Sequence, residues 1–519
     1  MAGQPRKSRS RVEGTPQRHL EVETKLDLPA DVPLPRLTNR KQLLAVGLPA
    51  VGPDFSYELD ATYFDTAELD LLRSRLTLRR RTGGEDAGWH LKLPDTGRGR
   101  TEVTLPLGDE GHQRVPEPLA DLVRGAARGR ALVPVARLQN HRVVRHLLDD
   151  SGERRIEVAD DTVTATPLQP GGGAVQTWRE LEAEVVGGDA DQLAATVAVL
   201  RSGGATPAAG PSKLGRALPL PPRESGLPRK SAGATLLFAL DRQRDALLTV
   251  DRRLRESDRT AVVDGRRVQR RIRSVLKVFG PMFDPEVADA VRGGLRELGE
   301  SLARCREVDV LRARLHSQLI EEPDEYARQA KLRLDAELDD RASRAWSRIV
   351  GFLDGEGYLA TLRALDGLLD EPAVTRRAHR AAVTELPPLL DRSWEKLRSL
   401  ADTALADPDH TPTVHETRKA TKTLRYATEA TVSALGDNAV VLAAGLEDIQ
   451  EVLGEHRDSI LAAELLVELA RGQNTDGVAG FIFGRLHAVE QALAHGAIDD
   501  FADAWDRVED GDLVAALAR

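Results

Sequence analysis

Hydrophobic and charged residues alternate in short segments over the first part of the chain, from about residue 19 to residue 186. The segments HLEVETKLDL, LTLRRR, GWHLKL and WRELEAEV show the alternation most clearly. A period of two is typical of β-strands, because successive side chains point to opposite faces of a sheet. Gly83 with Gly84 and Gly171 to Gly173 are candidate turns, and residues 189–201 are predicted to form a helix.

The pattern changes after the segment PLPPRESGLPRKSAG, residues 219–233, whose Pro and Gly content predicts a linker. Apolar residues are then spaced three to four apart, as in ATLLFALDRQRDALLTVDRRL, which predicts helices. We therefore expect an α+β multidomain protein. Its parts are a flexible basic tail over 1–18, a β domain over 19–220, a linker over 221–232 and an all-α domain over 233–519.

The helical region contains an internal repeat. RRVQRRIR from Arg266 and RKATKTLR from Arg418 share their basic and apolar positions. LARCRE from Leu302 and LGEHRD from Leu453 match at nearly the same offset. Two matches in the same order predict that the all-α domain has two related halves.

Composition limits the classes of function. The 519 residues include 73 Lys and Arg against 82 Asp and Glu, and the net charge of -9 excludes a uniformly basic coat for nucleic acid. No apolar run approaches the roughly 20 residues that span a bilayer, and the single cysteine, Cys305, cannot form an internal disulfide. With no apolar secretory signal at its start, the sequence predicts a protein of the reducing cytoplasm without a membrane partner.

Several predicted strands carry charge along one whole face. Glu21, Glu23 and Lys25 are spaced two apart, and the same spacing recurs in Arg79 with Arg81, His90 with Lys92, Arg100 with Glu102, and Glu180 with Glu182 and Glu184. Such faces could be the solvated side of a half-buried sheet. If the sheet closes into a barrel, they line its lumen instead. Carboxylates there suit Mg²⁺ or Mn²⁺, and Lys and Arg suit a chain of phosphates.

Ordered motifs run through the same region. They are EVETK from Glu21, YFDT from Tyr63, LRRR from Leu78, LKLP around Lys92, RTE from Arg100, ELEAE from Glu180 and SKLGR from Ser212. Together they resemble the CYTH family of triphosphate tunnel metalloenzymes over residues 19–220. The resemblance implies a closed antiparallel β tunnel with flanking helices, which binds a triphosphate and one or two divalent ions.

The resemblance also implies roles for single residues. The metal ligands would be Glu21, Glu23, Asp160, Glu182 and Glu184. Lys25 and Lys92 would act in catalysis, and the triphosphate would be bound by Arg79, Arg81, Arg100, Arg142 and Lys213. The expected activity is hydrolysis of inorganic triphosphate or a related triphosphate with Mg²⁺ or Mn²⁺. A class IV adenylate cyclase and a non-catalytic polyphosphate-binding scaffold are the alternatives.

Two predicted helices carry basic stripes. The first stripe is Arg266, Arg270, Arg273 and Lys277, and the second is His415, Arg418, Lys422 and Arg425. Either stripe alone could be a solvated face paired with acidic residues. Their equivalent places in the repeat favour a polyanion as the ligand. No specific nucleic acid is expected, because no reader motif accompanies the stripes and aromatic residues make up only 4% of the chain.

The segments RRVQRRIRS, CREVDVL, HETRKATKTLRY and LGEHRD resemble the CHAD domain, a two-half helical module often joined to CYTH domains and associated with inorganic polyphosphate. The resemblance covers about residues 233–510. It implies that His415 and His456 contact phosphate. The corresponding first-half histidine is replaced by Val263, and Glu307 stands where Asp is more usual. We expect polyphosphate binding, with association with polyphosphate granules.

Overall fold

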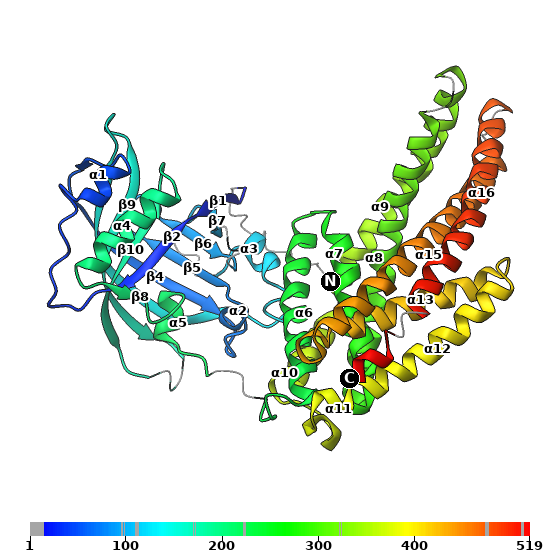
Figure 1. Cartoon of the computed structure of the whole chain (residues 1–519). Coiled ribbons are helices and arrows are strands. Elements are labelled where there is room, and N and C mark those ends of the chain that lie inside the picture. The colour runs from blue at the N-terminus through cyan, green and yellow to red at the C-terminus, as the bar shows by residue number, and fades with distance from the viewer. Residues whose placement is uncertain are drawn as a thin grey trace, which may run out of the picture. The chain divides into compact units, whose positions relative to one another are not determined.

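The computed structural model describes residues 15–94, 97, 99–108, 114–169, 171, 173–221, 225–320, 322, 324–472, 477–509 and 513–518. It divides into two compact units, Met1–Pro222 and Arg223–Arg519. The first unit is built on a β-sheet and the second on helices (Figure 1). Most of the predicted basic tail and part of the predicted linker lie outside the described residues, and the first strand already begins at Gln17.

The β unit holds one 11-stranded sheet. Its strands are β1 (Gln17–Glu21), β2 (Glu23–Asp27), β3 (Ala50–Val51), β4 (Phe55–Asp65), β5 (Thr77–Thr82), β6 (Gly88–Lys92), β7 (Arg100–Leu105), β8 (Val133–Leu148), β9 (Arg154–Pro167), β10 (Gln176–Val185) and β11 (Thr206–Pro207). The strand order is β1-β7-β6-β5-β4-β8-β9-β10-β2-β11, with β3 beside β8. Every pairing is antiparallel, as expected.

The expected closure of the sheet is not confirmed, because the hydrogen-bonded path between the described strands is open. β1 pairs with β7 at one end of the path, and β2 pairs with β10 near the other end. These two strands follow one another in the chain and are separated only by Val22. A single strand segment is thus divided between two neighbours, which brings the ends of the sheet together without a continuous ladder.

Short helices complete the β unit, namely α1 (Lys41–Ala45), α2 (Asp70–Arg73), α3 (Glu117–Leu122), α4 (Ala190–Ser202) and α5 (Lys213–Ala217). The helix predicted over 189–201 is confirmed as α4, whose capping box joins Asp189 and Gln192. Its Leu193 and Leu200 pack in a core with Leu26 of β2. Gly83 has a φ of 82° in the turn between β5 and β6, a conformation that favours glycine.

The helical unit consists of α6 (Ala232–Arg255), α7 (Ala261–Val278), α8 (Pro285–Leu319), α9 (Asp324–Leu353), α10 (Glu356–Asp370), α11 (Ala382–Glu385), α12 (Pro387–Ala406), α13 (Thr411–Glu429), α14 (Val432–Leu435), α15 (Asp437–Ala470) and α16 (Gly477–Glu509). Short 3-10 turns lie at Gly280–Met282, Arg376–His379 and Ala515–Ala518. The absence of strands in the described part of this unit agrees with the predicted all-α domain.

The helix order repeats within this unit. α7 and α8 have 18 and 35 residues, and their counterparts α13 and α15 have 19 and 34. α8 with α9 and α15 with α16 form two long hairpins (Figure 1). The hairpins share one core, which includes Leu311, Leu334, Leu466 and Phe483. The predicted pair of related halves is therefore present in the fold.

Candidate functional site

The charged faces of the strands meet around one cavity of about 650 Å³ in the β unit, here called the β cavity. Its lining includes the predicted residues Glu21, Glu23, Lys25, Arg79, Arg81, Lys92, Arg100, Arg142, Glu182, Glu184 and Lys213. They come from β1, β2, β5, β6, β7, β8, β10 and α5. The alternation in the sequence therefore placed these side chains on the correct face.

Most of the carboxylates in the β cavity have cationic partners. Lys92 Nζ lies 2.5 Å from Glu21 Oε2, and Lys25 Nζ lies 2.9 Å from Glu23 Oε2. Glu182 contacts Lys25 and accepts a hydrogen bond of 2.5 Å from Arg142. Charges of both signs are therefore interleaved, and a phosphate chain would have to replace some of these carboxylates as the partner of the cations.

Glu184 differs from Glu21, Glu23 and Glu182, because it has no ion pair within the described residues. Its half-buried side chain is close enough to Glu21 and Glu23 that burial and these two carboxylates raise its pKa to about 7. A divalent cation bound by these three carboxylates would offset both the burial of their charges and their mutual repulsion. Their hard oxygen ligands are the kind that Mg²⁺ and Mn²⁺ prefer, so the chemistry of this donor set suits such an ion.

Guanidinium groups crowd another part of the β cavity. Burial and the neighbouring Arg79 and Arg142 lower the pKa of Arg81 to about 9. Arg100 is held by hydrogen bonds from its guanidinium to the carbonyl oxygens of Leu93 and Arg75, at 2.8 and 3.1 Å. Several buried like charges at one place favour an anionic ligand.

Lys213 enters the β cavity from α5. Ser212 caps this short helix by accepting a hydrogen bond from the amide of Gly215 at 3.0 Å. Lys213 Nζ lies 2.9 Å from Asp161, 2.7 Å from Glu180 and 2.7 Å from Glu182. The motif SKLGR thus supplies both the cap and a buried lysine that holds three carboxylates.

Asp160 is not brought to the β cavity, which corrects its prediction as a metal ligand. It faces the opposite side of β9 and pairs with Arg179 at 2.7 Å. The adjacent Asp161 points inward instead, fully buried, and accepts hydrogen bonds of 2.8 and 2.7 Å from Arg142. The VADD segment contains both acids, and only the parity of the strand distinguishes them.

Glu102, His19 and His90 also line the β cavity and were not predicted as site residues. Glu102 is buried on β7 and contacts His19 at 3.0 Å and His90 at 3.2 Å. Oxygen and nitrogen atoms of His19, Glu21 and Glu102 lie within 4.8 Å of one another. In the sequence, Glu102 could have been identified from the RTE motif and from its spacing of two from Arg100.

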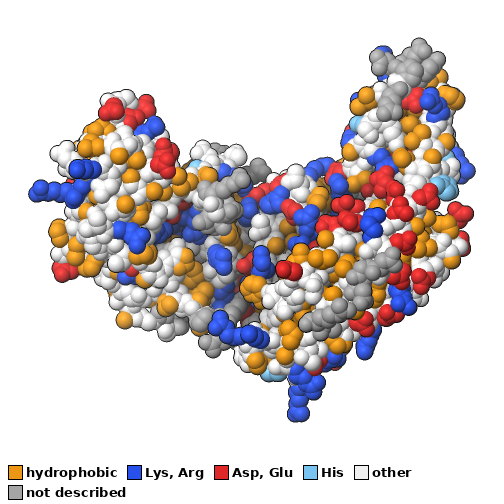
Figure 2. All heavy atoms as spheres, viewed as in Figure 1, with side chains coloured by type: hydrophobic (Ala, Val, Ile, Leu, Met, Phe, Trp, Pro, Cys, Tyr) orange, Lys and Arg blue, Asp and Glu red, His pale blue; other side chains and the backbone are white. Residues whose placement is uncertain are grey.

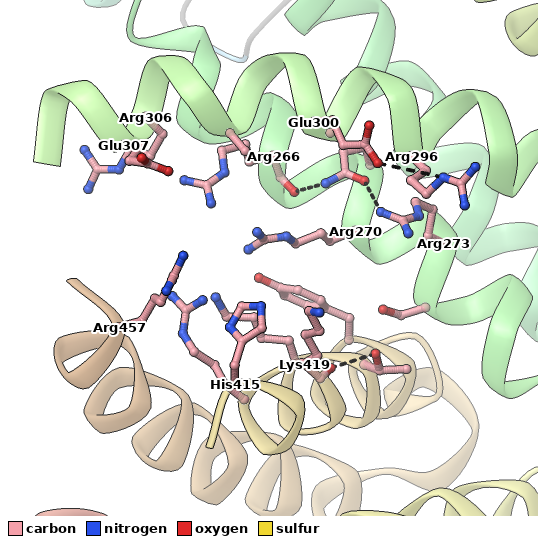
Figure 3. A pocket seen from close by; sticks show the side chains of 18 of the residues that line it. Arg266, Arg270, Arg273, Arg296, Glu300, Arg306, Glu307, His415, Lys419 and Arg457 are labelled. Atoms are coloured by element: carbon pink, nitrogen blue, oxygen red, sulfur yellow. Dashed lines mark hydrogen bonds and ion pairs between the residues drawn. The ribbon is translucent and has the colours of Figure 1, made fainter. Parts of the chain in front are cut away.

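The basic stripes of the helical unit line a second cavity of about 580 Å³, here called the basic groove. Its walls come from α7, α8, α13 and α15, so both halves of the repeat contribute. Figure 3 shows Arg266 and Arg270 of α7 extending toward the wall that carries His415 and Arg457. The predicted residues that line it are Arg266, Arg270, Arg273, Lys277, His415, Arg418 and Lys422.

The central cations of the basic groove lack neutralising partners. Within the described residues, Arg266, Arg418 and Lys422 make no ion pair, and the Nε atoms of both arginines are buried without a hydrogen-bond partner. Burial and neighbouring guanidinium groups lower the pKa of Arg266 and of Arg418 to about 10. Such unsatisfied buried donors are rare in folded proteins and are well suited to binding an anion.

Close helix packing brings the stripe of α7 against α8. A side chain at Gly299 of α8 would meet the amide of Gln269 at 2.8 Å, and one at Gly265 of α7 would meet Leu302 at 2.9 Å. Glycine at both positions permits this approach. This approach brings cationic side chains of α8 to the groove, and two more join it from α13 and α15. None of these five was predicted: Arg292, Arg296, Arg306, Lys419 and Arg457.

Arg425 and His456 do not line the basic groove, which corrects two predicted polyphosphate contacts. Arg425 pairs with Glu429 at 3.1 Å and with Glu447 of α15 at 2.6 Å, so acidic partners hold it away from the groove. His456 is 6% exposed, and the next residue, Arg457, lines the groove in its place. Neighbouring positions on a helix face different directions, about 100° apart.

The exposed surface of the helical unit differs from the groove. Figure 2 shows Asp and Glu side chains gathered over the part of this unit where α15 lies, with basic side chains interspersed. The overall charge of -9 is thus compatible with a cationic groove. Among the described residues, every helix is too short or too polar to cross a bilayer.

Comparison with known proteins gives independent evidence about the family of this chain. Residues 19–202 match the CYTH domain and residues 238–467 match the CHAD domain. The uncharacterized protein Rv2226 of Mycobacterium tuberculosis is 34% identical over 506 residues, which cover 92% of this chain and 94% of that protein.

Two solved structures are similar to the chain in part. PptA from Streptomyces chartreusis has 25% identity and a TM-score of 0.47, and the match covers 53% of this chain and 99% of that one. The CHAD domain from the plant Ricinus communis has 22% identity and a TM-score of 0.44, with 54% and 94% covered. From the ordered domain matches and the mycobacterial relative, we conclude that this chain belongs to the family of proteins in which a CYTH domain is followed by a CHAD domain.

Proposed function

We propose that the β cavity hydrolyses a phosphoanhydride bond of inorganic triphosphate with Mg²⁺ or Mn²⁺. One observation carries this proposal: a single cavity combines an unpaired carboxylate, Glu184, beside Glu21 and Glu23, with the crowded guanidinium groups of Arg79 and Arg81. A divalent ion and a phosphate chain together would neutralise both clusters. Neither ligand alone would do so.

In this proposal, the acidic residues bind the ion and the basic residues bind the phosphates. Glu21, Glu23 and Glu184 would hold the ion, with Glu182 at the edge of the cluster. When bound, the ion would neutralise charge on the phosphate oxygens and orient a water. Arg79, Arg81, Arg100 and Arg142 would bind the phosphates and stabilise the charge that spreads over them during transfer.

The lysines have different surroundings and therefore different proposed roles. Lys25 and Lys92 would exchange their partners Glu23 and Glu21 for oxygens of the reacting phosphate. Lys213 has three carboxylate partners, so it would chiefly keep Glu182 in place.

Phosphate release from inorganic triphosphate by the full-length protein tests this function. Release should require Mg²⁺ or Mn²⁺ and stop with a chelator. Glu23→Gln and Glu184→Gln should each reduce the rate by about 100-fold or more, because each removes a charge from the ion site. Unchanged circular dichroism would show that both variants are folded. Equal rates with chelator, or in both variants, would refute the metal site.

We also propose that the basic groove binds inorganic polyphosphate and could hold the protein on polyphosphate granules. Support comes from the half-buried side chains of Arg266, Arg418 and Lys422, which make no ion pair within the described residues and belong to two equivalent helices. A chain of linked phosphates can meet all of them at once. Binding of polyphosphate of defined length should weaken as salt is added. No binding at low salt would refute this role.

Two alternatives give different results in the same assays. A non-catalytic scaffold would bind polyphosphate but release no phosphate under any condition. A nucleotide cyclase is favoured by one feature, the aromatic end of the β cavity, where the rings of Phe55 and His146 meet edge to face at 6.3 Å. Incubation with ATP and Mn²⁺ should nevertheless yield little cyclic nucleotide, and rapid formation of that product would favour the cyclase.

A further inference from the structure

Lys422 occupies an unusual position in the basic groove. The charged groups that act on it are Arg266 and Arg270 from α7, Arg418 from its own helix α13, and Asp458 from α15. From α8, Arg306 and Glu307 line the same groove. Lys422 has no ion pair within the described residues, so three guanidinium groups face it with one carboxylate as a partial counterweight.

This arrangement affects lysine and arginine differently. A guanidinium keeps its proton even when it is crowded, whereas an amine gives up its proton much more readily. Burial and the charges of Arg418, Arg270 and Arg266 lower the pKa of Lys422 to about 5. The same crowding leaves the arginines charged and favours the neutral amine of Lys422 in the free groove.

We propose that the basic groove takes up a proton at Lys422 when it binds a polyanion. This inference rests on the proposed binding of polyphosphate by the same groove. Phosphate oxygens that neutralise Arg266, Arg270 and Arg418 remove the repulsion that disfavours the ammonium form. The proton comes from solvent to the lone pair of Nζ, no covalent bond to the ligand forms, and the proton leaves when the ligand does.

Proton uptake makes the groove selective for chains over single phosphates. One phosphate ion can neutralise only part of the cluster, so it gains little from charging Lys422. A linked chain spans the cluster and gains an additional ammonium contact. The affinity for polyphosphate should therefore fall by up to about tenfold for each unit that pH rises, over the range where Lys422 is neutral without ligand and charged with it.

His415 lines the same groove and titrates in the same sense. Burial and the charges of Lys419, Arg457 and Arg418 lower its pKa to about 4, so it too is neutral in the free groove near neutral pH. Its Nδ1 is buried without a hydrogen-bond partner. Any second proton taken up with the ligand would belong here, and the experiment must separate the two residues.

Calorimetry of the full-length protein tests the inference. Polyphosphate of defined length is titrated at about pH 7 in two buffers that differ in their heat of ionisation, and the difference in binding heat counts the protons taken up. The wild-type protein should take up about one proton per groove. Lys422→Met keeps the length and apolar stem of the side chain but cannot be protonated, so uptake should fall by most of that proton.

Lys331→Met is the matched control, because Lys331 is an exposed lysine of α9 that does not line the basic groove. It should keep the uptake of the wild-type protein. Binding without any buffer dependence in the wild-type protein would overturn the inference and leave polyphosphate binding intact. Full uptake in Lys422→Met would also overturn it and assign the proton to another group such as His415. No binding in the wild-type protein would refute the function of the groove itself.

Discussion

At the scale of single residues, one position along an element decides what a side chain can do. Asp160 and Asp161 are adjacent on β9, yet Asp160 pairs with Arg179 on one face and Asp161 with Arg142 on the other. His456 and Arg457 differ in the same way on α15. In each pair, the direction of the side chain decides its contacts: Asp161 pairs with Arg142 of the β cavity, and Arg457 lines the basic groove.

The two aspartates give a matched test of this orientation. Asp161→Asn should destabilise the β unit by about 3 kcal/mol or more, because it removes a carboxylate from a fully buried cluster and leaves cations short of a partner. Asp160→Asn should cost about 1 kcal/mol, because its pair with Arg179 is partly exposed to solvent. Urea unfolding measures both losses, and equal losses would contradict the opposite facing of the two side chains.

At the scale of elements, α7 and α13 each bring one basic face into the basic groove while the remaining faces pack. Val268 and Ile272 of α7 and Leu424 of α13 lie in the same hydrophobic core. This packing directs Arg266 of α7 and Arg418 of α13 into the same basic groove. It also turns Arg425 toward Glu447 on α15, so a basic residue of the same stripe has a structural contact instead.

A second matched pair of variants tests whether Arg418 of α13 faces the basic groove and Arg425 faces away from it. Arg418→Gln should weaken polyphosphate binding by about tenfold, the loss expected for one charge-assisted contact. It should not lower the stability of the free protein, because it relieves repulsion among unpaired cations. Arg425→Gln should leave binding nearly unchanged but reduce stability by about 1 to 3 kcal/mol, since Glu429 and Glu447 lose their partner. Reversed outcomes would assign Arg425 to the groove.

At the scale of the whole molecule, the two charged cavities differ in how their acids and bases are arranged. The β cavity interleaves acids with bases, as the proposed binding of an ion together with phosphate requires. The basic groove has few acids, and its central cations lack partners among the described residues. Each cavity is lined by residues of one unit only.

This separation predicts that the two activities can be removed independently. In the full-length protein, Arg266→Gln combined with Arg418→Gln should abolish most polyphosphate binding while phosphate release from triphosphate stays within about twofold. The same preparations serve both assays, so a folding defect would be visible as a loss in each. A large fall in triphosphate turnover with unchanged circular dichroism would show instead that the units are energetically coupled.

The sequence by itself determined the local structure and most of the chemistry. A period of two predicted the charged faces of β1, β2, β5, β6, β7 and β10, because strand geometry fixes the face of each residue once the strand is recognised. Three-to-four spacing and the repeated motifs predicted the helical halves and the stripe on α7. The motifs EVETK, ELEAE and SKLGR identified most of the residues that meet in the β cavity.

Only the tertiary structure decided which residues of other elements lie opposite each charged face of a strand or helix. Periodicity relates a residue to the axis of its own element and contains no information about a neighbouring element. It therefore could not show that β1 and β2 divide between two partners, that Glu447 neutralises Arg425, or that Arg306 and Arg457 complete the basic groove. Packing alone sets burial and the distance between charges, and these two quantities determine which carboxylates, guanidinium groups and amines remain available to a ligand.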